Sequence, residues 1–206
     1  MKIVQPFANH PLWEFEDVEL PELVFDESLF IKKNPKYNRD PLSNSEVFNE
    51  RSKIHGVSQY EINNKSLEIL RDVVHNIIRT IRDNASEEAN EKVIDLYCLN
   101  PWDMKDAYPD VITDHAGFYM GEHLDNRNVK CNLFINLENN ISSTEFKILE
   151  NPNPHNYKEY IPSLVEWKSP TQKGAGFFYF NTPELWHTIR VSEPERKIAM
   201  LGVTIE

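Results

Sequence analysis

The second half of the sequence consists of short apolar runs separated by turn-forming residues. The runs are rich in β-branched and aromatic residues, and the segments between them are rich in Asn, Asp, Pro and Ser. Short strands with turns at close intervals are typical of an antiparallel sandwich or a jelly roll. The predicted strands are Val93–Leu99, Phe118–His123, Cys131–Leu137, Thr144–Leu149, Gly176–Phe180, Trp186–Val191 and Lys197–Ile205. We therefore expect a mainly β (α+β) fold.

A long helix is predicted over residues 63–84, in the first half of the chain. Apolar residues recur there at three- and four-residue steps, which places them on one face of a helix. They are Leu67, Leu70, Val74, Ile77, Ile78 and Ile81. An Asn at position 63 or 64 would cap the start of the helix, and Asn84 would end it.

A chain of 206 residues has the length of a single domain. We expect residues 1–90 to form an N-terminal extension whose helix packs on a β core of residues 91–206. Within the extension, residues 23–25 are expected to form a short strand and residues 31–53 an exposed loop. Residues 150–173 are expected to be a long insertion between two strands of the core, and long ordered loops often bind ligands.

Charge and composition argue against several classes of protein. The net charge is −11, from 22 Lys and Arg against 33 Asp and Glu, whereas general nucleic-acid binding and anionic membranes require basic surfaces. No run approaches the ~20 apolar residues of a membrane-spanning helix. The N-terminus lacks the apolar segment of a secretory signal. The 2 cysteines, Cys98 and Cys131, are too few for a disulfide framework. We expect a cytoplasmic protein that does not act on membranes or on nucleic acids in general.

His123, Asp125 and His187 are the candidate metal ligands. His123 and Asp125 are two residues apart at a predicted strand, so their side chains point to the same side. His187 lies in another predicted strand. Two histidines and one carboxylate on one side of an ion leave adjacent positions for other ligands, an arrangement that suits Fe(II). A structural zinc site would more often have four ligands that include thiolates.

Arg196 is the candidate anion-binding residue. Residues 186–201 predict a hairpin in which His187 opposes Met200 and Arg196 shares the face of His187. A register shifted by one residue would place Lys197 inside instead. We favour Arg196 because its planar guanidinium pairs bidentately with a carboxylate. The spacing alone is also compatible with a surface hairpin of charged residues.

The order and spacing of several segments resemble one family of enzymes. The segments are AGFYMGEHLDN (116–126), KCNLFINL (130–137), STEF (143–146), KGAGFFYFN (173–181) and WHTIRVSEPERKIAMLGV (186–203). Together they are similar to the 2-oxoglutarate- and Fe(II)-dependent dioxygenases, especially the small prolyl-hydroxylase-like members of bacteria and phages. The resemblance covers roughly residues 93–203. It implies a double-stranded β-helix, which is a cupin-like jelly roll, with helices packed on its outside.

The resemblance also implies roles for individual residues. His123, Asp125 and His187 match the iron ligands of the family, and Arg196 matches the residue that holds the far carboxylate of 2-oxoglutarate. Relatives often have a Ser or Thr two residues after the basic residue, as a second donor to that carboxylate. Ile198 occupies that position here. We therefore expect the second donor to come from elsewhere, with Asn132 and Tyr119 as candidates by position.

The function implied by the resemblance is hydroxylation of an amino-acid or peptidyl, prolyl-like substrate, with release of succinate and CO₂. The required partners are Fe(II), 2-oxoglutarate and O₂, and the family resemblance allows ascorbate as an auxiliary reductant. The cell would be a bacterium or a phage-infected host. Two alternatives remain: a cupin-like metal enzyme that does not use 2-oxoglutarate, and a non-catalytic jelly-roll binding module.

Overall fold

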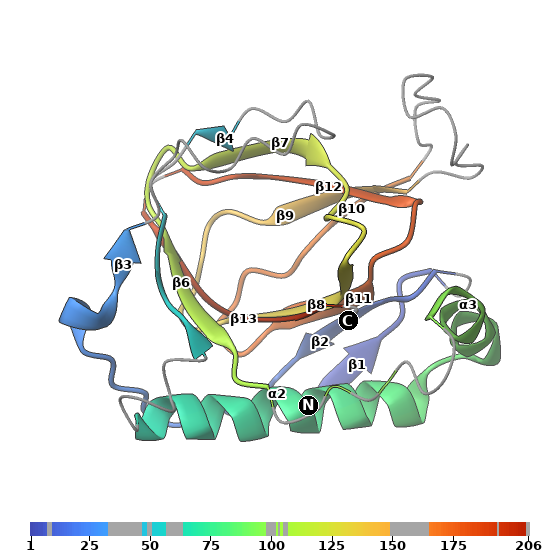
Figure 1. The fold of residues 1–206 in the computed structure, drawn as a ribbon, viewed down its shortest axis with the longest axis horizontal. Helices are drawn as coiled ribbons and strands as arrows, with labels where there is room; N and C mark the ends of the chain where they lie inside the picture. The colour runs from blue at the N-terminus through green and yellow to red at the C-terminus, as the bar shows by residue number, and fades with distance from the viewer. Residues whose placement is uncertain are drawn as a thin grey trace.

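Two antiparallel β-sheets face each other. A long helix (residues 65–84) lies across the outer face of the larger sheet, and a shorter helix (residues 87–97) lies at one end of it (Figure 1). The structure is a computed structural model that describes residues 1–7, 10–32, 47–48, 51–56, 64–97, 102, 104, 107–148, 165–192 and 194–204. The architecture is mainly β and resembles a jelly roll, as the sequence predicts. No helix among the described residues has the length and apolar character needed to cross a membrane.

The described strands form one sheet of eight strands and one of five. In spatial order, the larger sheet contains β1 (Lys2–Val4), β2 (Leu12–Glu16), β11 (Gly176–Phe180), β8 (Val129–Asn136), β13 (Arg196–Thr204), β6 (Asp110–Asp114), β5 (Arg51–Ile54) and β3 (Ile31–Lys32). The smaller sheet contains β10 (Val165–Lys168), β9 (Thr144–Ile148), β12 (Leu185–Arg190), β7 (Tyr119–His123) and β4 (Val47–Phe48). The helices are α2 (Lys65–Asn84), α3 (Glu87–Tyr97) and the short 3₁₀ helix η1 (Glu27–Leu29).

The larger sheet is buried on both faces, which explains the continuous apolar run of β11. Phe178 and Phe180 belong to the core cluster that includes the apolar face of α2. Phe177 and Tyr179 lie in a second cluster, with residues of the smaller sheet. Because alternate residues of a strand face opposite sides, a strand buried on both faces needs apolar or aromatic residues throughout.

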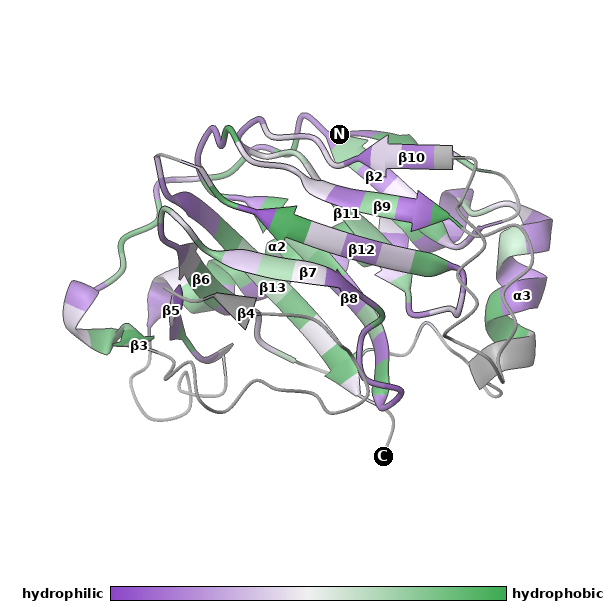
Figure 2. Cartoon of the chain, turned by 90° about the horizontal axis from the view of Figure 1, so that it is seen from above, coloured by the Kyte–Doolittle hydropathy of each residue, from purple (hydrophilic) through white to green (hydrophobic). Residues whose placement is uncertain are grey.

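The smaller sheet has a different pattern, because only one of its faces is buried against the rest of the protein. Along β9 and β12, buried residues alternate with half-buried or exposed ones. Figure 2 shows a change between hydrophobic and hydrophilic colour along β9, whereas in β12 a buried position is occupied by the hydrophilic His187. The alternation orients one set of side chains, including His187, toward the larger sheet.

Helix α2 occurs where the apolar stripe predicts a helix. The side chain of Asn64 caps it by accepting hydrogen bonds from the backbone N–H groups of Ser66 and Leu67, at 2.9 and 3.3 Å. The six apolar residues of the stripe are all buried in the core cluster under the larger sheet. Ser66 also exchanges hydrogen bonds with the backbone of Val24, which ties the N-terminal segment to the helix.

Several expected elements differ in the structure. Residues 93–97, expected to begin a strand, lie in α3, while 98 and 99 lie outside the described residues. The hydroxyl of Ser86 accepts from the backbone N–H of Ala89, and Ala89 and Val93 are buried four residues apart. This cap and helical spacing outweigh the β-branched character of the run. Residues 23–25 form no strand.

Two segments expected to be loops contain strands. Residues 31–53 include β3, β4 and the start of β5, which pairs with β6. The expected insertion at 150–173 includes β10, which pairs with β9. Residues 149–164 lie outside the described residues.

The predicted hairpin of residues 186–201 is wrong. Strand β12 pairs with β7 and β9 in the smaller sheet, whereas β13 pairs with β6 and β8 in the larger sheet. The turn between them therefore crosses from one sheet to the other, and Met200 does not oppose His187. Its partners are Asp110 and Phe134.

The contact between α2 and the larger sheet predicts a large effect for Leu70→Ala. Leu70 is fully buried, so the substitution should lower the free energy of unfolding by about 2–5 kcal/mol. Ile94→Ala is the control, because Ile94 is 52% exposed on α3, and its effect should stay within about 0.5 kcal/mol. Urea unfolding of both variants measures these values. Equal, small effects would contradict the packing of α2.

Candidate metal centre

His123 and His187 lie side by side on the inner face of the smaller sheet. His123 ends β7, and its register partner in β12 is His187. Their ring centroids are 4.3 Å apart, and each residue is 7% exposed. Two imidazoles are thus held close together on neighbouring strands, in a buried position where their backbones are fixed by the sheet.

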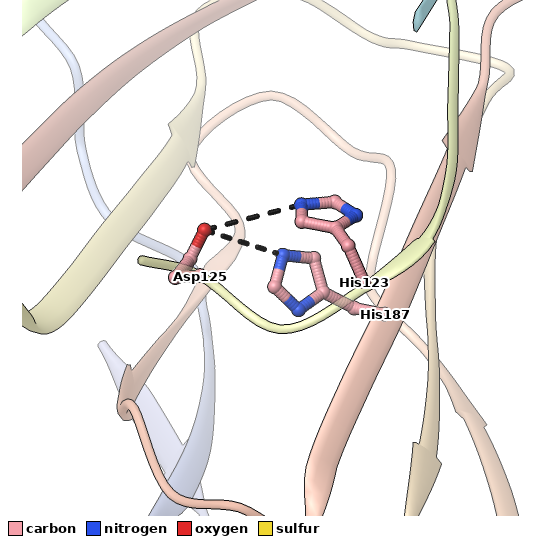
Figure 3. Close-up of side chains that lie close together, drawn as sticks. All are labelled: His123, Asp125 and His187. Atoms are coloured by element: carbon pink, nitrogen blue, oxygen red, sulfur yellow. Dashed lines mark ion pairs between the residues drawn. The ribbon is translucent and has the colours of Figure 1, made fainter. Parts of the chain in front are cut away.

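Asp125 completes a cluster of three donors (Figure 3). Its Oδ1 atom is 3.9 Å from Nε2 of His123 and 3.8 Å from Nε2 of His187. All three donor atoms lie within 4.8 Å of one another, close enough for a single ion to draw them together. Among the described residues, these three side chains form a cluster whose donor atoms are close enough to share a metal ion.

The hydrogen bonds of the two imidazoles decide which nitrogen faces the cluster. Nδ1 of His123 is 2.7 Å from the backbone oxygen of Gly121, and Nδ1 of His187 is 3.3 Å from that of Leu185. A carbonyl oxygen only accepts hydrogen bonds, so each Nδ1 carries the proton and donates it. In the neutral imidazole, each Nε2 then presents its lone pair to the centre, as a metal ligand requires.

His123 is uncharged at neutral pH. Burial, followed by the electrostatic interaction with the neighbouring His187, lowers the pKa of His123 to about 4, although Asp125 acts in the opposite direction. A proton therefore does not compete with a cation for the Nε2 lone pair of His123 near pH 7.

Asp125 is held from the opposite sheet. Its Oδ2 atom accepts hydrogen bonds from Nδ2 of Asn132, at 2.7 Å, and from the hydroxyl of Tyr179. Asn132 and Tyr179 are register partners on β8 and β11, and Nδ2 of Asn132 also donates to the Tyr179 hydroxyl oxygen, at 3.0 Å. Burial and the charge of Asp125 raise the pKa of Tyr179 well above its ordinary value, so the hydroxyl keeps its proton. Oδ2 is thereby anchored, and Oδ1 is left to face the histidines.

Aromatic rings enclose the histidine side of the centre. Phe146 stacks on His187, with ring centroids 5.1 Å apart, and Tyr179 meets the same imidazole edge-on at 5.6 Å. Phe146 and Tyr179 are fully buried. This packing restricts the rotation of His187 and keeps water from that side of the ring.

Arg196 points into the space between the two sheets. It starts β13 in the larger sheet, and its Nη1 atom donates to the Thr144 hydroxyl of the smaller sheet, at 3.0 Å. Its Nε and Nη2 atoms donate to Oδ2 of Asp114, at 3.1 and 2.7 Å. The residue is 4% exposed. Arg196 is therefore interior, although the hairpin register from which we inferred its orientation is wrong.

A second arginine lies on the other side of Asp114. Strands β5, β6 and β13 place Arg51, Asp114 and Arg196 in one row of register partners. Nε and Nη2 of Arg51 donate to the Asp114 carboxylate, at 2.5 and 3.1 Å. Burial alone would raise the pKa of Asp114, but the two guanidinium groups outweigh it and hold this pKa below its ordinary value. The carboxylate stays charged between them.

Asn132 and Tyr119 are the residues that we expected as second donors to 2-oxoglutarate. Asn132 lies beside the metal ligands, and Tyr119 lies away from them. Asn132 contacts Asp125, as described above. Tyr119 lies under the guanidinium of Arg190, which is 4.4 Å from its ring centroid and exposed. A bulge in β7 shifts the pairing with β12 between His187 and Ile189, so Tyr119 does not share the face of His123.

Sequence reasoning missed several residues of this interior. Tyr179 was detectable, because it alternates with Phe177 in a strand that was predicted. Asp114 ends a run of β-branched residues that is itself a strand signal. Arg51 offers no comparable local signal, since only its pairing across β5 and β6 brings it to Asp114.

No protein-family model matches the chain, and no curated protein matches it. Among solved structures, a prolyl hydroxylase from Trichoplax adhaerens, in complex with a peptide fragment of the hypoxia inducible factor oxygen degradation domain, matches with a TM-score of 0.54. The chain shares its fold with that prolyl hydroxylase. The match covers 85% of this chain and 70% of the prolyl hydroxylase chain, at 11% sequence identity. At 11% sequence identity, this match is evidence of a shared fold.

The anchoring of Asp125 predicts that Tyr179→Phe weakens metal binding. Loss of the hydroxyl frees Oδ2 of Asp125, and loss of such an outer hydrogen bond typically lowers metal affinity by about 10- to 100-fold. Titration calorimetry with Mn(II) measures the affinity. Tyr119→Phe is the matched control, because the Tyr119 ring lies beside Arg190, and it should bind Mn(II) as the unmodified protein does. Unchanged affinity in Tyr179→Phe would show that the hydrogen bond does not orient the ligand.

Proposed function

We propose that this protein is a 2-oxoglutarate- and Fe(II)-dependent oxygenase that hydroxylates an amino-acid or peptidyl substrate. The observation that carries the proposal is the cluster of His123, Asp125 and His187, located in the same interior as the buried Arg196. In this proposal the two sheets form a double-stranded β-helix, and the fold likeness to a prolyl hydroxylase supports that assignment.

The donor set fits Fe(II). Two imidazole nitrogens and one carboxylate oxygen are the ligands of the facial triad, which leaves positions on the ion for a cosubstrate and O₂. A structural zinc site would favour a fourth ligand and thiolates. Cys131, the cysteine within the described residues, is buried with its sulfur 3.4 Å from the sulfur of Met104, outside the three-donor cluster.

The arginine fits the far carboxylate of 2-oxoglutarate. In this proposal the keto-acid end of the cosubstrate lies at the iron and the other end at Arg196. When bound, iron and cosubstrate supply the oxidative chemistry: O₂ is consumed, 2-oxoglutarate becomes succinate and CO₂, and the second oxygen atom enters a C–H bond of the substrate. Ascorbate is an auxiliary reductant compatible with this chemistry.

The residues of the chain provide geometry and charge. His123 and His187 offer preoriented lone pairs, because their Nδ1 protons are held by backbone carbonyls. Asn132 and Tyr179 hold Asp125 so that one oxygen faces the ion. Phe146 and Tyr179 keep water from His187, which limits unproductive reactions at the centre.

The substrate class rests on the structural comparison. The matching prolyl hydroxylase is in complex with a peptide fragment. We therefore assign an amino-acid or peptidyl side chain, prolyl-like in character, as the group that is hydroxylated.

Arg196→Met tests the cosubstrate. Loss of a charge-assisted hydrogen-bonded pair should weaken 2-oxoglutarate binding by about 10- to 100-fold, while Mn(II) affinity stays unchanged. Asp114 keeps Arg51 as a counter-charge in this variant, so the fold should persist. Calorimetric titration of the Mn(II)-loaded protein gives both affinities. A cupin-like metal enzyme without 2-oxoglutarate has no need of Arg196 and would show no such selective loss.

Asp125→Ala tests the metal centre. This variant should lose succinate formation from 2-oxoglutarate, because a ligand that orients the metal is removed. Release of succinate, measured by mass spectrometry with Fe(II), O₂ and ascorbate present, is the readout. Full activity would remove Asp125 from the ligand set. If the unmodified protein binds metal but forms no succinate with any amino-acid or peptide tested, the reading as a non-catalytic binding module is favoured.

A further inference from the structure

The row of Arg51, Asp114 and Arg196 contains one more positive than negative charge. Asp114 is fully buried, and the side chains of Arg51 and Arg196 are 15% and 5% exposed. Arg196 and Asp114 alone would form a neutral pair. Arg51, on the other side of the carboxylate, gives the row a net charge of +1.

This charge balance decides whether the interior can accept an anion. A carboxylate that approached a neutral Arg196–Asp114 pair would leave a net negative charge in a buried place, and an uncompensated buried charge is costly. With Arg51 in the row, the same carboxylate brings the net charge to zero. Binding of an anion at Arg196 is then favoured by both hydrogen bonding and charge.

The hydrogen bonds leave donors for such an anion. A guanidinium has five N–H groups. The contacts of Arg196 with Asp114 and Thr144 use three of them. The Arg51 guanidinium donates two N–H groups to Asp114 and also lies over the ring of Phe118, 4.3 Å from its centroid. Asp114 thus orients both guanidiniums without consuming all their donors.

The row also lies on the same side of the smaller sheet as the metal ligands. Arg196 donates to the hydroxyl of Thr144 on β9, at 3.0 Å, and Phe146, two residues further along β9, stacks on His187 with ring centroids 5.1 Å apart. Because alternate residues of a strand share a face, the row and the three-donor centre border one interior, as a cosubstrate that bridges them requires.

We propose that Arg51 is a positioning residue for the far carboxylate of 2-oxoglutarate, acting through Asp114 by balancing its charge and fixing its orientation. This inference rests on the proposed function. It assigns a role to a residue of the N-terminal segment, so that β5 completes a site whose other groups come from the β core.

The test measures binding of two keto acids to the full-length, Mn(II)-loaded protein by calorimetry. One probe is 2-oxoglutarate, and the other is 2-oxobutyrate, which has the same chelating end and no far carboxylate. Arg51→Met should weaken 2-oxoglutarate binding by about ten-fold or more, with 2-oxobutyrate changed by less than about two-fold. Arg51→Lys keeps the charge and should retain most of the affinity.

Two further variants make the test specific. Arg190→Met removes an arginine that lies over Tyr119 on the outer side of the smaller sheet, and it should change neither affinity. The double variant Arg51→Met with Asp114→Asn removes one charge of each sign, which returns the row to +1. It should recover 2-oxoglutarate binding relative to Arg51→Met, and it also serves if Arg51→Met alone does not fold.

The outcomes separate the two proposals. If the unmodified protein binds Mn(II) but not 2-oxoglutarate, the proposed function itself is wrong. If it binds 2-oxoglutarate and Arg51→Met binds it equally well, the role of Arg51 is wrong and the proposed function stands. Equal weakening for both keto acids, or no recovery in the double variant, would mean that Arg51 supports the fold and does not serve the carboxylate.

Discussion

Polar side chains that point into the space between the two sheets need partners there, and this constraint organises the protein. The larger sheet is buried on both faces, by α2 on one side and by the smaller sheet on the other. A charged group in such a place is stable only when it is paired. Asp125 is paired with Asn132 and Tyr179, and Asp114 with two arginines. Both carboxylates are thereby fixed in orientation.

The two networks have complementary consequences. At Asp125, one oxygen is anchored and the other faces two imidazoles, so the site has the character of a cation-binding centre. At Asp114, a single carboxylate lies between two guanidiniums, so the surplus charge is positive. A molecule with a chelating end and a distant carboxylate satisfies both. This combination of a three-donor cluster and a surplus positive charge in one interior is the physical basis for proposing 2-oxoglutarate as the cosubstrate.

Local patterns predicted the elements that depend on local physics. The stripe of α2 and the apolar runs of β8, β9, β11 and β12 are readable from residue spacing alone. The strand predicted over Val93–Leu99 is wrong for residues 93–97, because the β-branched residues there belong to helix α3, which Ser86 caps. The predicted hairpin of residues 186–201 is wrong for another reason. The sequence of a turn does not show whether the two strands that it connects pair with each other or belong to opposite sheets. Arg51 was missed because it enters the interior through long-range pairing of β5 with β6.

We infer that one ion held by His123, Asp125 and His187 binds the keto-acid end of 2-oxoglutarate. Anaerobic titration of the metal-free protein with Fe(II), and then with 2-oxoglutarate, tests this by visible absorption. Binding at this centre should give a weak charge-transfer band that appears only when both are present and saturates at one 2-oxoglutarate per iron. The band should be absent in His187→Ala. Iron binding without this band in the unmodified protein would mean that 2-oxoglutarate does not chelate an ion at this centre.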